Sequence, residues 1–415
     1  MTRRADDAAP AAACTVSVAD PAMLDARILA DWDSLSREAE HPNPFFAPWF
    51  LRPAIRWLDP EGAVRLLLIH GGDGALIGLM PVVPGATYAG LPVRNQSIWK
   101  NNHLYVGTPL IRSGTAMCAM AALLDWIGTG PHGDSFLRLT QFPAEGPVFR
   151  ALTTLCAGRG RETFIRRRQL HAVLHRGHDF DTLFDAAHST RQRAELRRRF
   201  RRFDEGGAVR VDETTLSPAA ALPLAEAFMR LENDGWKGAS ETGFALAKSQ
   251  AEAAFFRDVL RRGAAQGRIL STVVARDGAP VAISIALRGG DRSFGFKTAF
   301  DRAHAKSSPG VRVFHETTRR MLADPGCALY DSCAMPDHPL VDRLWPDRAE
   351  TVEIDIPAAG RTPARVLRLA TRMATTKKRI ARAWGEAESA GPRPGGARPA
   401  PVTPAPWPSR RGSRA

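Results

Sequence analysis

Residues 269–300 read ILSTVVARDGAPVAISIALRGGDRSFGFKTAF, and residues 307–322 read SSPGVRVFHETTRRML. The first stretch holds three apolar runs separated by Asp-Gly and Gly-Gly-Asp, residues that accept the positive φ of tight turns between antiparallel strands. The second stretch opens with a Ser-Pro-Gly turn and continues with a helix expected over Val311–Leu322. A further apolar run at 328–334 and a short helical segment at 337–345 follow. We therefore expect three antiparallel strands, a helix, a strand and a helix, in that order.

This order of elements is that of an acyl-CoA N-acyltransferase core. In such a core the turn before the helix directs backbone N–H groups toward a ligand, and a helix N-terminus is a suitable site for a pyrophosphate. Many α/β domains share parts of this order, so the order alone is a weak indication.

Several short motifs make the indication more specific. They are Asn43-Pro44-Phe45-Phe46, Leu231-Glu232, Gly235-Trp236-Lys237-Gly238, Phe255-Phe256-Arg257, Phe294–Asp301, Ser308–Val311, Asp331–Ala334 and Pro336–Pro339. Over roughly Trp32 to Ile356 they resemble the CelD/BcsL-like acetyltransferases, a bacterial family associated with cellulose biosynthesis. That family belongs to the GNAT (N-acetyltransferase) superfamily and is distantly similar to the Fem-type aminoacyltransferases of peptidoglycan. The resemblance implies a transferase that uses acetyl-CoA in polysaccharide or cell-envelope assembly.

A similar order of hairpin, strand, helix, strand and helix occurs earlier in the chain, beginning with the apolar runs 64–70 and 76–83. The two halves are not visibly alike in sequence, so the repeat is one of architecture, and Fem-like proteins are built as such tandem units. We expect an α/β fold of tandem GNAT-like mixed sheets flanked by helices. The expected segments are 1–20 (disordered), 20–175 (first half, closed by a strand near 163–174), 176–204 (basic helical connector), 205–356 (second half) and 357–415 (basic helix and disordered Pro/Arg-rich tail).

The bulk properties favour a globular protein of more than one core. The length of 415 residues exceeds what one core usually serves, and the apolar share of 44% is ordinary. No apolar run approaches the roughly 20 residues that span a bilayer, and the N-terminus lacks the apolar region of a signal peptide, so we expect a cytoplasmic protein. The cysteines number five, are scattered and form no Cys-x-x-Cys pair, which argues against a disulfide framework and a zinc site. The histidines show no metal spacing, and we expect no metal.

The positive charge is concentrated at the C-terminus. From Arg361 onward there are 13 Lys and Arg against two acids, so 11 of the 14 net positive charges lie in this tail. A basic tail attached to a folded part of nearly neutral net charge indicates a segment that binds anionic surfaces without specificity, and not a DNA-reading domain. Residues 365–384 could form a basic amphipathic helix that contacts an anionic membrane or a synthase, and a tail that only improves solubility is an equal alternative.

The predicted connector contains an unusual run, Arg191–Arg202, with seven Arg and one Glu. Leu196, Phe200 and Phe203 lie at helical spacing and form a narrow apolar stripe. Two interpretations have equal weight: a solvated helix that packs by this stripe, or an anion-binding face for the phosphates of a coenzyme or an activated substrate.

The candidate donor site is the turn at Ser308, Gly310 and Val311, with Lys306 and Lys297 as nearby cations. In the superfamily this turn is usually richer in glycine, and here a Pro without an N–H stands between Ser308 and Gly310. This departure puts coenzyme A binding in doubt and is compatible with Fem-like relatives, which use an aminoacyl-tRNA donor. A charged loop such as the one at Lys306 is also often merely solvated.

The candidates for proton transfer are Asp331, Asp301 and His338. Asp331 is expected at the centre of a buried strand, where burial raises the pKa of a carboxyl and suits it to act as a base. It could equally be a structural acceptor for loop amides. Cys333 is interpreted as a small core residue, because no basic partner is close in sequence.

The candidates for substrate binding are Trp236, Lys237 and Asp337. Trp236 and Lys237 stand in a glycine-flanked break after a predicted helix, and ordinary hydrophobic anchoring is an equal interpretation of Trp236. Asp337 could instead cap the short helix that follows it.

Three functions are consistent with these observations. The first is a GNAT-type N-acyltransferase that moves an acyl group, most simply acetyl from acetyl-CoA, to an amine by direct attack. The second is a Fem-like transferase with an aminoacyl-tRNA donor, the only setting in which we expect a nucleic acid partner. The third is a non-enzymatic accessory protein of a membrane-bound polysaccharide synthase, tethered by the basic tail. The active site is expected in the second half, where the motif residues are concentrated.

Overall fold

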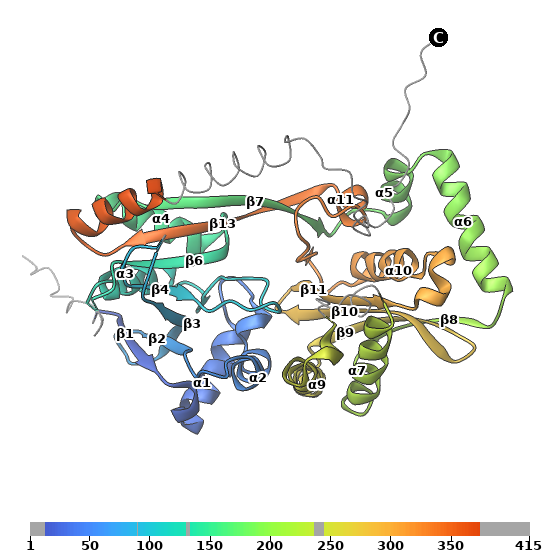
Figure 1. The fold of residues 1–415 in the computed structure, drawn as a ribbon, viewed down its shortest axis with the longest axis horizontal. Coiled ribbons are helices and arrows are strands. Elements are labelled where there is room, and N and C mark those ends of the chain that lie inside the picture. Colours follow the sequence, from blue (N-terminus) through green and yellow to red (C-terminus); the bar gives the residue numbers. More distant parts are fainter. Residues whose placement is uncertain (1–12, 89, 130–132, 236–244, 374–415) are drawn as a thin grey trace, which may run out of the picture. The chain divides into compact units, whose positions relative to one another are not determined.

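The computed structural model describes residues 13–88, 90–129, 133–235 and 245–373. Its strands form one mixed sheet in the order β1-β2-β3-β4-β6-β13-β7-β12-β11-β10-β9-β8, with β5 paired to β3 off this path (Figure 1). The strands are β1 (Thr15–Ala19), β2 (Arg65–His70), β3 (Leu76–Gly85), β4 (Asn95–Ile98), β5 (Leu110–Ile111), β6 (Phe136–Pro143), β7 (Phe164–His175), β8 (Val209–Thr215), β9 (Ile269–Arg276), β10 (Ala279–Gly289), β11 (Arg292–Phe300), β12 (Leu329–Asp331) and β13 (Asp347–Pro357).

Helices flank this sheet. They are α1 (Ala26–Arg37), α2 (Pro48–Leu58), α3 (Ala116–Trp126), α4 (Pro147–Gly158), α5 (Phe180–Ala187), α6 (Thr190–Glu205), α7 (Pro218–Asn233), α9 (Gln250–Ala265), α10 (Pro309–Ala323) and α11 (Val341–Leu344), with short 3-10 turns η1 (Pro21–Met23), η2 (Pro44–Phe46), η3 (Leu246–Lys248) and η4 (Arg302–Ser307). The chain divides into two compact units, Met1–Leu367 and Arg368–Ala415, and the sheet and the cavity described below belong to the first.

The order predicted over 269–345 is confirmed. Strands β9, β10 and β11 form an antiparallel meander, α10 follows, and β12 and α11 come next. The turn between β9 and β10 takes the predicted conformation, with φ of 51° at Asp277 and 78° at Gly278. Most side chains of β9 and β10 are buried, as a strand covered on both faces requires.

The strand β7 does not close the first half as the sequence predicted. Strand β13, from the end of the predicted second half, lies between β6 and β7 and pairs antiparallel with both. The C-terminal end of β7 pairs with β12, which belongs to the second half. Figure 1 shows β7 and β13 running side by side from one half of the sheet to the other. The boundaries proposed for the two halves stay a prediction. Each half nevertheless contributes a strand to the other: β13 pairs with β6 and β7, and β7 pairs with β12.

One hydrophobic core extends across both predicted halves. The ring of Phe50 in α2 lies 5.5 Å from Phe255 in α9 and 5.5 Å from Phe296 in β11, in edge-to-face contacts. Such aromatic contacts add to the burial of apolar area and fix the rings relative to each other. The N-terminal segment is therefore packed directly against the strand that carries the candidate donor site.

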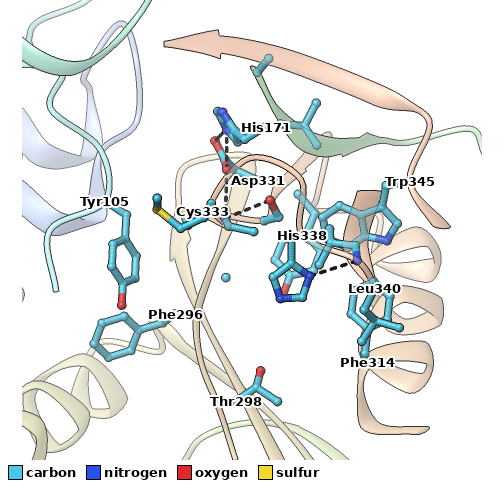
Figure 2. Close-up of a pocket in the computed structure, with 18 of the residues that line it drawn as sticks. Tyr105, His171, Phe296, Thr298, Phe314, Asp331, Cys333, His338, Leu340 and Trp345 are labelled. Atoms are coloured by element: carbon cyan, nitrogen blue, oxygen red, sulfur yellow. Dashed lines mark hydrogen bonds and ion pairs between the residues drawn. The ribbon is translucent and has the colours of Figure 1, made fainter. Parts of the chain in front are cut away.

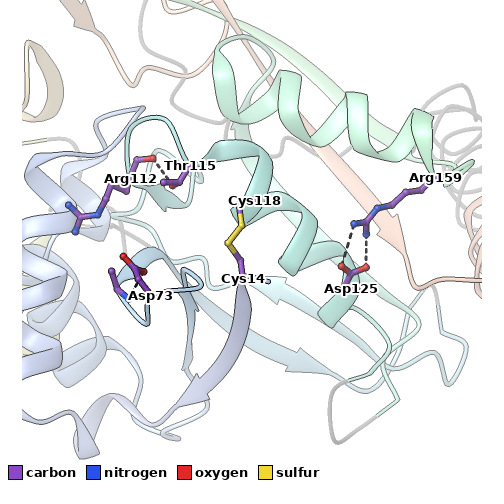
Figure 3. Close-up of a disulfide and its surroundings, with 8 residues drawn as sticks. Cys14, Asp73, Arg112, Thr115, Cys118, Asp125 and Arg159 are labelled. Carbon is purple, nitrogen blue, oxygen red and sulfur yellow. Dashed lines mark hydrogen bonds and ion pairs between the residues drawn. A yellow bond between two sulfur atoms is a disulfide. The ribbon is translucent and has the colours of Figure 1, made fainter. Parts of the chain in front are cut away.

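The N-terminal residues differ from two predictions. Residues 15–19, expected to be disordered, form β1, an edge strand paired with β2. Cys14, just before β1, is joined by a disulfide to Cys118 in α3, with a Cα–Cα distance of 6.0 Å (Figure 3). The sequence argued against a disulfide, and for this pair the argument is wrong. The two cysteines are 104 residues apart, so their spacing gives no hint that the sheet brings β1 beside α3.

Residues 361–373 are helical, and the remainder of the predicted basic helix and tail lies outside the described residues. Among the helices that the structure describes, none has the length and apolar character needed to cross a bilayer.

Candidate active site

A cavity of about 850 Å³ opens where β11 and β12 separate. The two strands pair in parallel only from Arg292 to Phe294, opposite Leu329–Asp331. Beyond Phe294, no described strand pairs with this edge of β11, and residues of α10, β7, β13 and the segment 332–341 line the space instead. An unpaired strand edge presents free N–H and C=O groups, so it can hold an extended ligand by backbone hydrogen bonds.

A β-bulge lies in β11 just beyond Phe294, in its pairing with β10. Ile285 of β10 pairs with Lys297 and the next residue pairs with Gly295, so Phe296 is the extra residue. A bulged residue is left out of the ladder, and bulges often re-aim groups beside active sites. The ring of Phe296 is anchored in the core described above, which fixes the bulge in place. The backbone around Phe296 can therefore offer a hydrogen-bond donor to a ligand carbonyl.

The turn before α10 is at the other end of β11. Ser308 has a left-handed backbone with φ of 56°, and Ser308, Gly310 and Val311 line the cavity. Gly310 lies so close to Phe300 that a Cβ there would be 2.9 Å from the ring. This close approach places the first turn of α10 directly against the end of β11. Lys297 also lines the cavity, so these four residues of the predicted donor site are brought together.

Lys306 lies apart from the cavity and beside the basic helix. With Glu195, Arg199, Arg202 and Ser307 it lines a hollow of about 310 Å³. Arg199 also donates a hydrogen bond to the Ser308 hydroxyl over 3.1 Å. Leu196 and Phe203 are buried, so α6 packs by its predicted apolar stripe. The apolar face of α6 packs against the protein, and Arg199 and Arg202 on another face of the helix lie beside the turn that precedes α10.

Asp331 forms a pair with His171. The His171 Nε2 atom lies 3.1 Å from Oδ2 and 3.0 Å from Oδ1 of Asp331, and the Cys333 N–H donates to Oδ1 over 2.8 Å (Figure 2). The pairing of β7 with β12 brings the two residues together although they are 160 positions apart. His171 was missed in the sequence, because no local pattern indicates the strand exchange that carries it here.

The pKa of Asp331 is lowered, whereas the sequence predicted that burial would raise it. Burial alone would raise the pKa of Asp331, but the hydrogen bond and charge of His171 and the Cys333 N–H hold it below its ordinary value. Burial alone would lower the pKa of His171, but the hydrogen bond and charge of Asp331 raise it. The imidazole, and not the carboxyl, is therefore the group of this pair that titrates nearer neutral pH.

The other predicted acid and base residues have different places. His338 lines the cavity, and its Nδ1 accepts the N–H of Val341 over 3.3 Å, so His338 and not Asp337 caps α11. Burial lowers the pKa of His338. Asp301 lies outside the cavity lining, where its carboxylate accepts the Ala303 N–H over 2.8 Å and caps η4. Asp337 is likewise absent from the lining.

Two candidate substrate contacts, Trp236 and Lys237, lie outside the described residues. Among the described residues, several from the predicted first half line the cavity, including His41, Tyr105 and Gln141. Burial raises the pKa of Tyr105, so its phenol keeps its proton and can donate a hydrogen bond. In Figure 2 Tyr105 and Phe296 lie together near Cys333.

Cys333 is not activated as a nucleophile. Burial and the neighbouring Asp331 carboxylate raise the pKa of its thiol well above the ordinary value. Its backbone has a left-handed φ of 51°, and Gln141 and Ser308, which also line the cavity, share this conformation. Non-glycine residues in this region store backbone strain and tend to gather at functional sites.

Comparison with known proteins agrees with this fold. A family model described as an acetyltransferase (GNAT) domain matches residues 190–338, which contain α6, the bulge in β11, the turn before α10 and Asp331. A search of curated proteins finds no match. Among solved structures, the crystal structure of FemX is 11% identical and covers 79% of this chain and 95% of its own, with a TM-score of 0.51. This likeness concerns the fold.

Two further solved structures are similar at lower TM-scores. L-PGS from Bacillus licheniformis is 14% identical, covering 84% of this chain and 97% of its own with a TM-score of 0.49. A tandem GNAT protein from the clavulanic acid biosynthesis pathway is 15% identical, covering 83% and 99% with a TM-score of 0.39.

Residues 190–338 are therefore a GNAT acetyltransferase domain, and this domain supports an acyltransferase enzyme. This confirms the predicted superfamily and the prediction of an enzyme. The narrower resemblance to the CelD/BcsL-like family stays a prediction. Among the described residues no group of three or more His, Cys, Asp or Glu could hold a metal ion.

Proposed function

We propose that this chain transfers an acetyl group from acetyl-CoA to an amine by direct attack in the cavity between β11 and β12. The observation that carries the proposal is the His171–Asp331 pair, which lies where these strands separate, next to the unpaired edge of β11 and close along the strand to its bulge with β10. In the reaction the amine nitrogen forms a bond to the thioester carbonyl carbon. The C–S bond then breaks, the amine loses a proton, and the thiolate of coenzyme A gains one.

The donor lies along β11 in this proposal. Its pantetheine arm occupies the gap after Phe294, where the strand edge offers backbone groups, and its carbonyl oxygen accepts a hydrogen bond from the bulged backbone at Phe296. The pyrophosphate lies at the N-terminus of α10, near Gly310. Pro309 has no N–H and cannot donate a hydrogen bond to the pyrophosphate. Arg199 and Lys306 lie beside this turn, and their positive charges attract the phosphates in its place.

His171 is the proton acceptor in this proposal. Asp331 holds the Nε2 side of the ring, and among the described residues the Nδ1 atom makes no hydrogen bond. A carboxylate that fixes one ring nitrogen leaves the other free to take a proton from a nucleophile, as in the pairs of hydrolases. Tyr105 lines the cavity and keeps its proton near neutral pH. Its phenol can therefore donate a hydrogen bond or a proton to the leaving thiolate.

An aminoacyl-tRNA donor is the second candidate, because Pro309 weakens the turn while α6 presents arginines beside it. Binding of tRNA would weaken steeply with salt, since it depends on phosphate contacts. The role in cell-envelope or polysaccharide assembly, and contact of the basic tail with an anionic membrane or a synthase, rest on the sequence resemblance and on the charge of the tail.

Isothermal titration of the full chain with acetyl-CoA and with bulk tRNA separates the two donors. We expect acetyl-CoA to bind in the micromolar range, and we expect Arg199→Gln and Lys306→Ala to weaken it. Arg210→Gln is the matched control, because Arg210 is exposed on β8 and forms an ion pair with Asp212 away from both hollows. Absence of acetyl-CoA binding together with salt-sensitive tRNA binding would overturn the choice of donor.

A further inference from the structure

The cavity extends along β11 beyond the reaction centre, away from the donor phosphates. Phe294 is the strand partner of Asp331, and Arg292 lies two residues before it, roughly 7 Å along the strand. Phe300, which contacts the first turn of α10, lies at the opposite end of β11, roughly 26 Å from Arg292. Arg292 is therefore close to the proton acceptor and far from the turn that would hold the pyrophosphate.

Arg292 lines the cavity, and none of the described carboxylates forms an ion pair with it. Its side chain is half-buried, and no ion pair or hydrogen bond joins its guanidinium to another residue in the described part of the chain. The carboxylates that line the same cavity are already engaged: Asp331 pairs with His171, and Glu350 accepts a hydrogen bond from Arg168 over 2.8 Å. A guanidinium withdrawn from water is stabilised when a carboxylate or phosphate pairs with it, so this one is available to a ligand.

His41 lines the same cavity as Arg292, near enough for the two groups to interact electrostatically, and is held by its neighbours in the chain. Pro42 packs against Gly290, and the buried Asn43 side chain donates to the carbonyl oxygens of Val106 and Thr108. Burial and the charge of Arg292 lower the pKa of His41 to about 4, so the imidazole is neutral at neutral pH. A neutral imidazole can donate one hydrogen bond to an anion that Arg292 attracts.

We propose that Arg292, with His41 beside it, binds an anionic group of the acceptor, so that the acceptor is a primary amine carrying a carboxylate or a phosphate. The inference rests on the proposed N-acyltransferase function and adds the chemical class of its acceptor. Arg292 lies only two residues before Phe294, the strand partner of Asp331. The anionic group and the reacting amine of the acceptor must therefore be close together, in one small molecule or at one end of a larger molecule.

Matched pairs of acceptors test this inference in a thiol-release assay with acetyl-CoA. Lysine is compared with cadaverine for a carboxylate, and glucosamine 6-phosphate with glucosamine for a phosphate. We expect the anionic member of at least one pair to have a KM at least about tenfold lower, the range of a hydrogen bond to a charged group. Arg292→Gln should abolish that preference through KM, Arg292→Lys should retain part of it, and Arg210→Gln should leave it unchanged. A preference that is absent, or that survives Arg292→Gln, overturns the inference.

A binding measurement judges the inference separately from the proposed function. Inorganic sulfate is titrated into the full chain in the presence of excess coenzyme A, which occupies the donor phosphate site. We expect sulfate to bind the wild type at least about tenfold more tightly than Arg292→Gln, while both bind coenzyme A equally. Equal sulfate binding refutes the anion site. Failure to bind coenzyme A, with the sulfate difference intact, refutes the donor and leaves the anion site supported.

Discussion

The substitution Asp331→Asn keeps the shape of the side chain and removes its charge. In the wild type this charge and its hydrogen bond raise the pKa of His171 against the effect of burial. Without them burial dominates, and the pKa of His171 falls below its ordinary value. An opposite charge in contact shifts a pKa by about 1–3 units, and each unit corresponds to about 1.4 kcal/mol.

This shift has a definite sign in the pH profile of catalysis. His171 accepts a proton only when it is neutral, so kcat/KM rises with pH through the pKa of His171. In Asp331→Asn we expect this rise to move to lower pH by about 1–3 units. We also expect the plateau to fall by about 10²–10⁴, the range of general acid–base catalysis, because the imidazole is a weaker base and is no longer oriented.

The assay is release of the coenzyme A thiol with an amine acceptor between about pH 5 and about pH 9, a range that brackets the ordinary pKa of histidine. The matched control is Asp301→Asn, since Asp301 caps η4 outside the cavity lining and an asparagine can also cap. A profile of Asp331→Asn that coincides with that of the wild type, in position and height, would refute the role of the pair in proton transfer.

The same pair has a signature in stability. The pKa of Asp331 is lowered, so its stabilising contribution is present above about pH 4 and is lost as pH falls through the folded-state value. The pKa of His171 is raised, so its contribution is present below about pH 6.5 and is lost as pH rises through the folded-state value. The difference in the free energy of unfolding between wild type and Asp331→Asn should be largest between these limits, at about 1.5–3 kcal/mol in urea titrations. A difference independent of pH would contradict the ion pair.

Three further predictions concern other parts of the chain. Cys118→Ser opens a disulfide that closes a separation of 104 residues, and should lower the free energy of unfolding by up to about 5 kcal/mol in urea titrations; an unchanged midpoint would show that the bond does not form. Gly310→Ala places a methyl group 2.9 Å from the Phe300 ring, so the first turn of α10 must shift; overpacking of this kind costs about 1–3 kcal/mol of stability, and acetyl-CoA binding should weaken in calorimetry, whereas unchanged affinity would place the donor elsewhere. Asp355→Ala leaves Arg138 without its buried partner, and should cost about 3–5 kcal/mol in urea titrations; a loss below about 1 kcal/mol would count against a buried ion pair.

Local patterns predicted the local part of the fold. The turn residues Asp277 and Gly278 and the apolar runs around them indicate the meander, and the Ser-Pro-Gly turn indicates the start of α10. Four residues predicted at the donor site, Lys297, Ser308, Gly310 and Val311, line one cavity because they lie on β11 or at the start of the helix that follows it.

Long-range contacts could not be predicted in this way. His171 reaches Asp331 only because β7 and β13 are exchanged between the halves, and the choice of strand partner leaves no mark on the composition of either strand. The same holds for Tyr105, which the fold carries to the cavity from the first half, and for the Cys14–Cys118 disulfide. The direction of the pKa shift of Asp331 was predicted wrongly, because the apolar sequence around Asp331 indicates its burial but nothing in the sequence indicates that His171 pairs with it.

A crystal structure of the full chain with acetyl-CoA would show directly whether the donor lies along β11. We expect the pantetheine arm in the gap between β11 and β12, the thioester carbonyl oxygen within hydrogen-bonding distance of the backbone at the Phe296 bulge, and the pyrophosphate at the first turn of α10 near Gly310. Coenzyme A bound outside this cavity, or with its thioester remote from His171, would contradict this expectation.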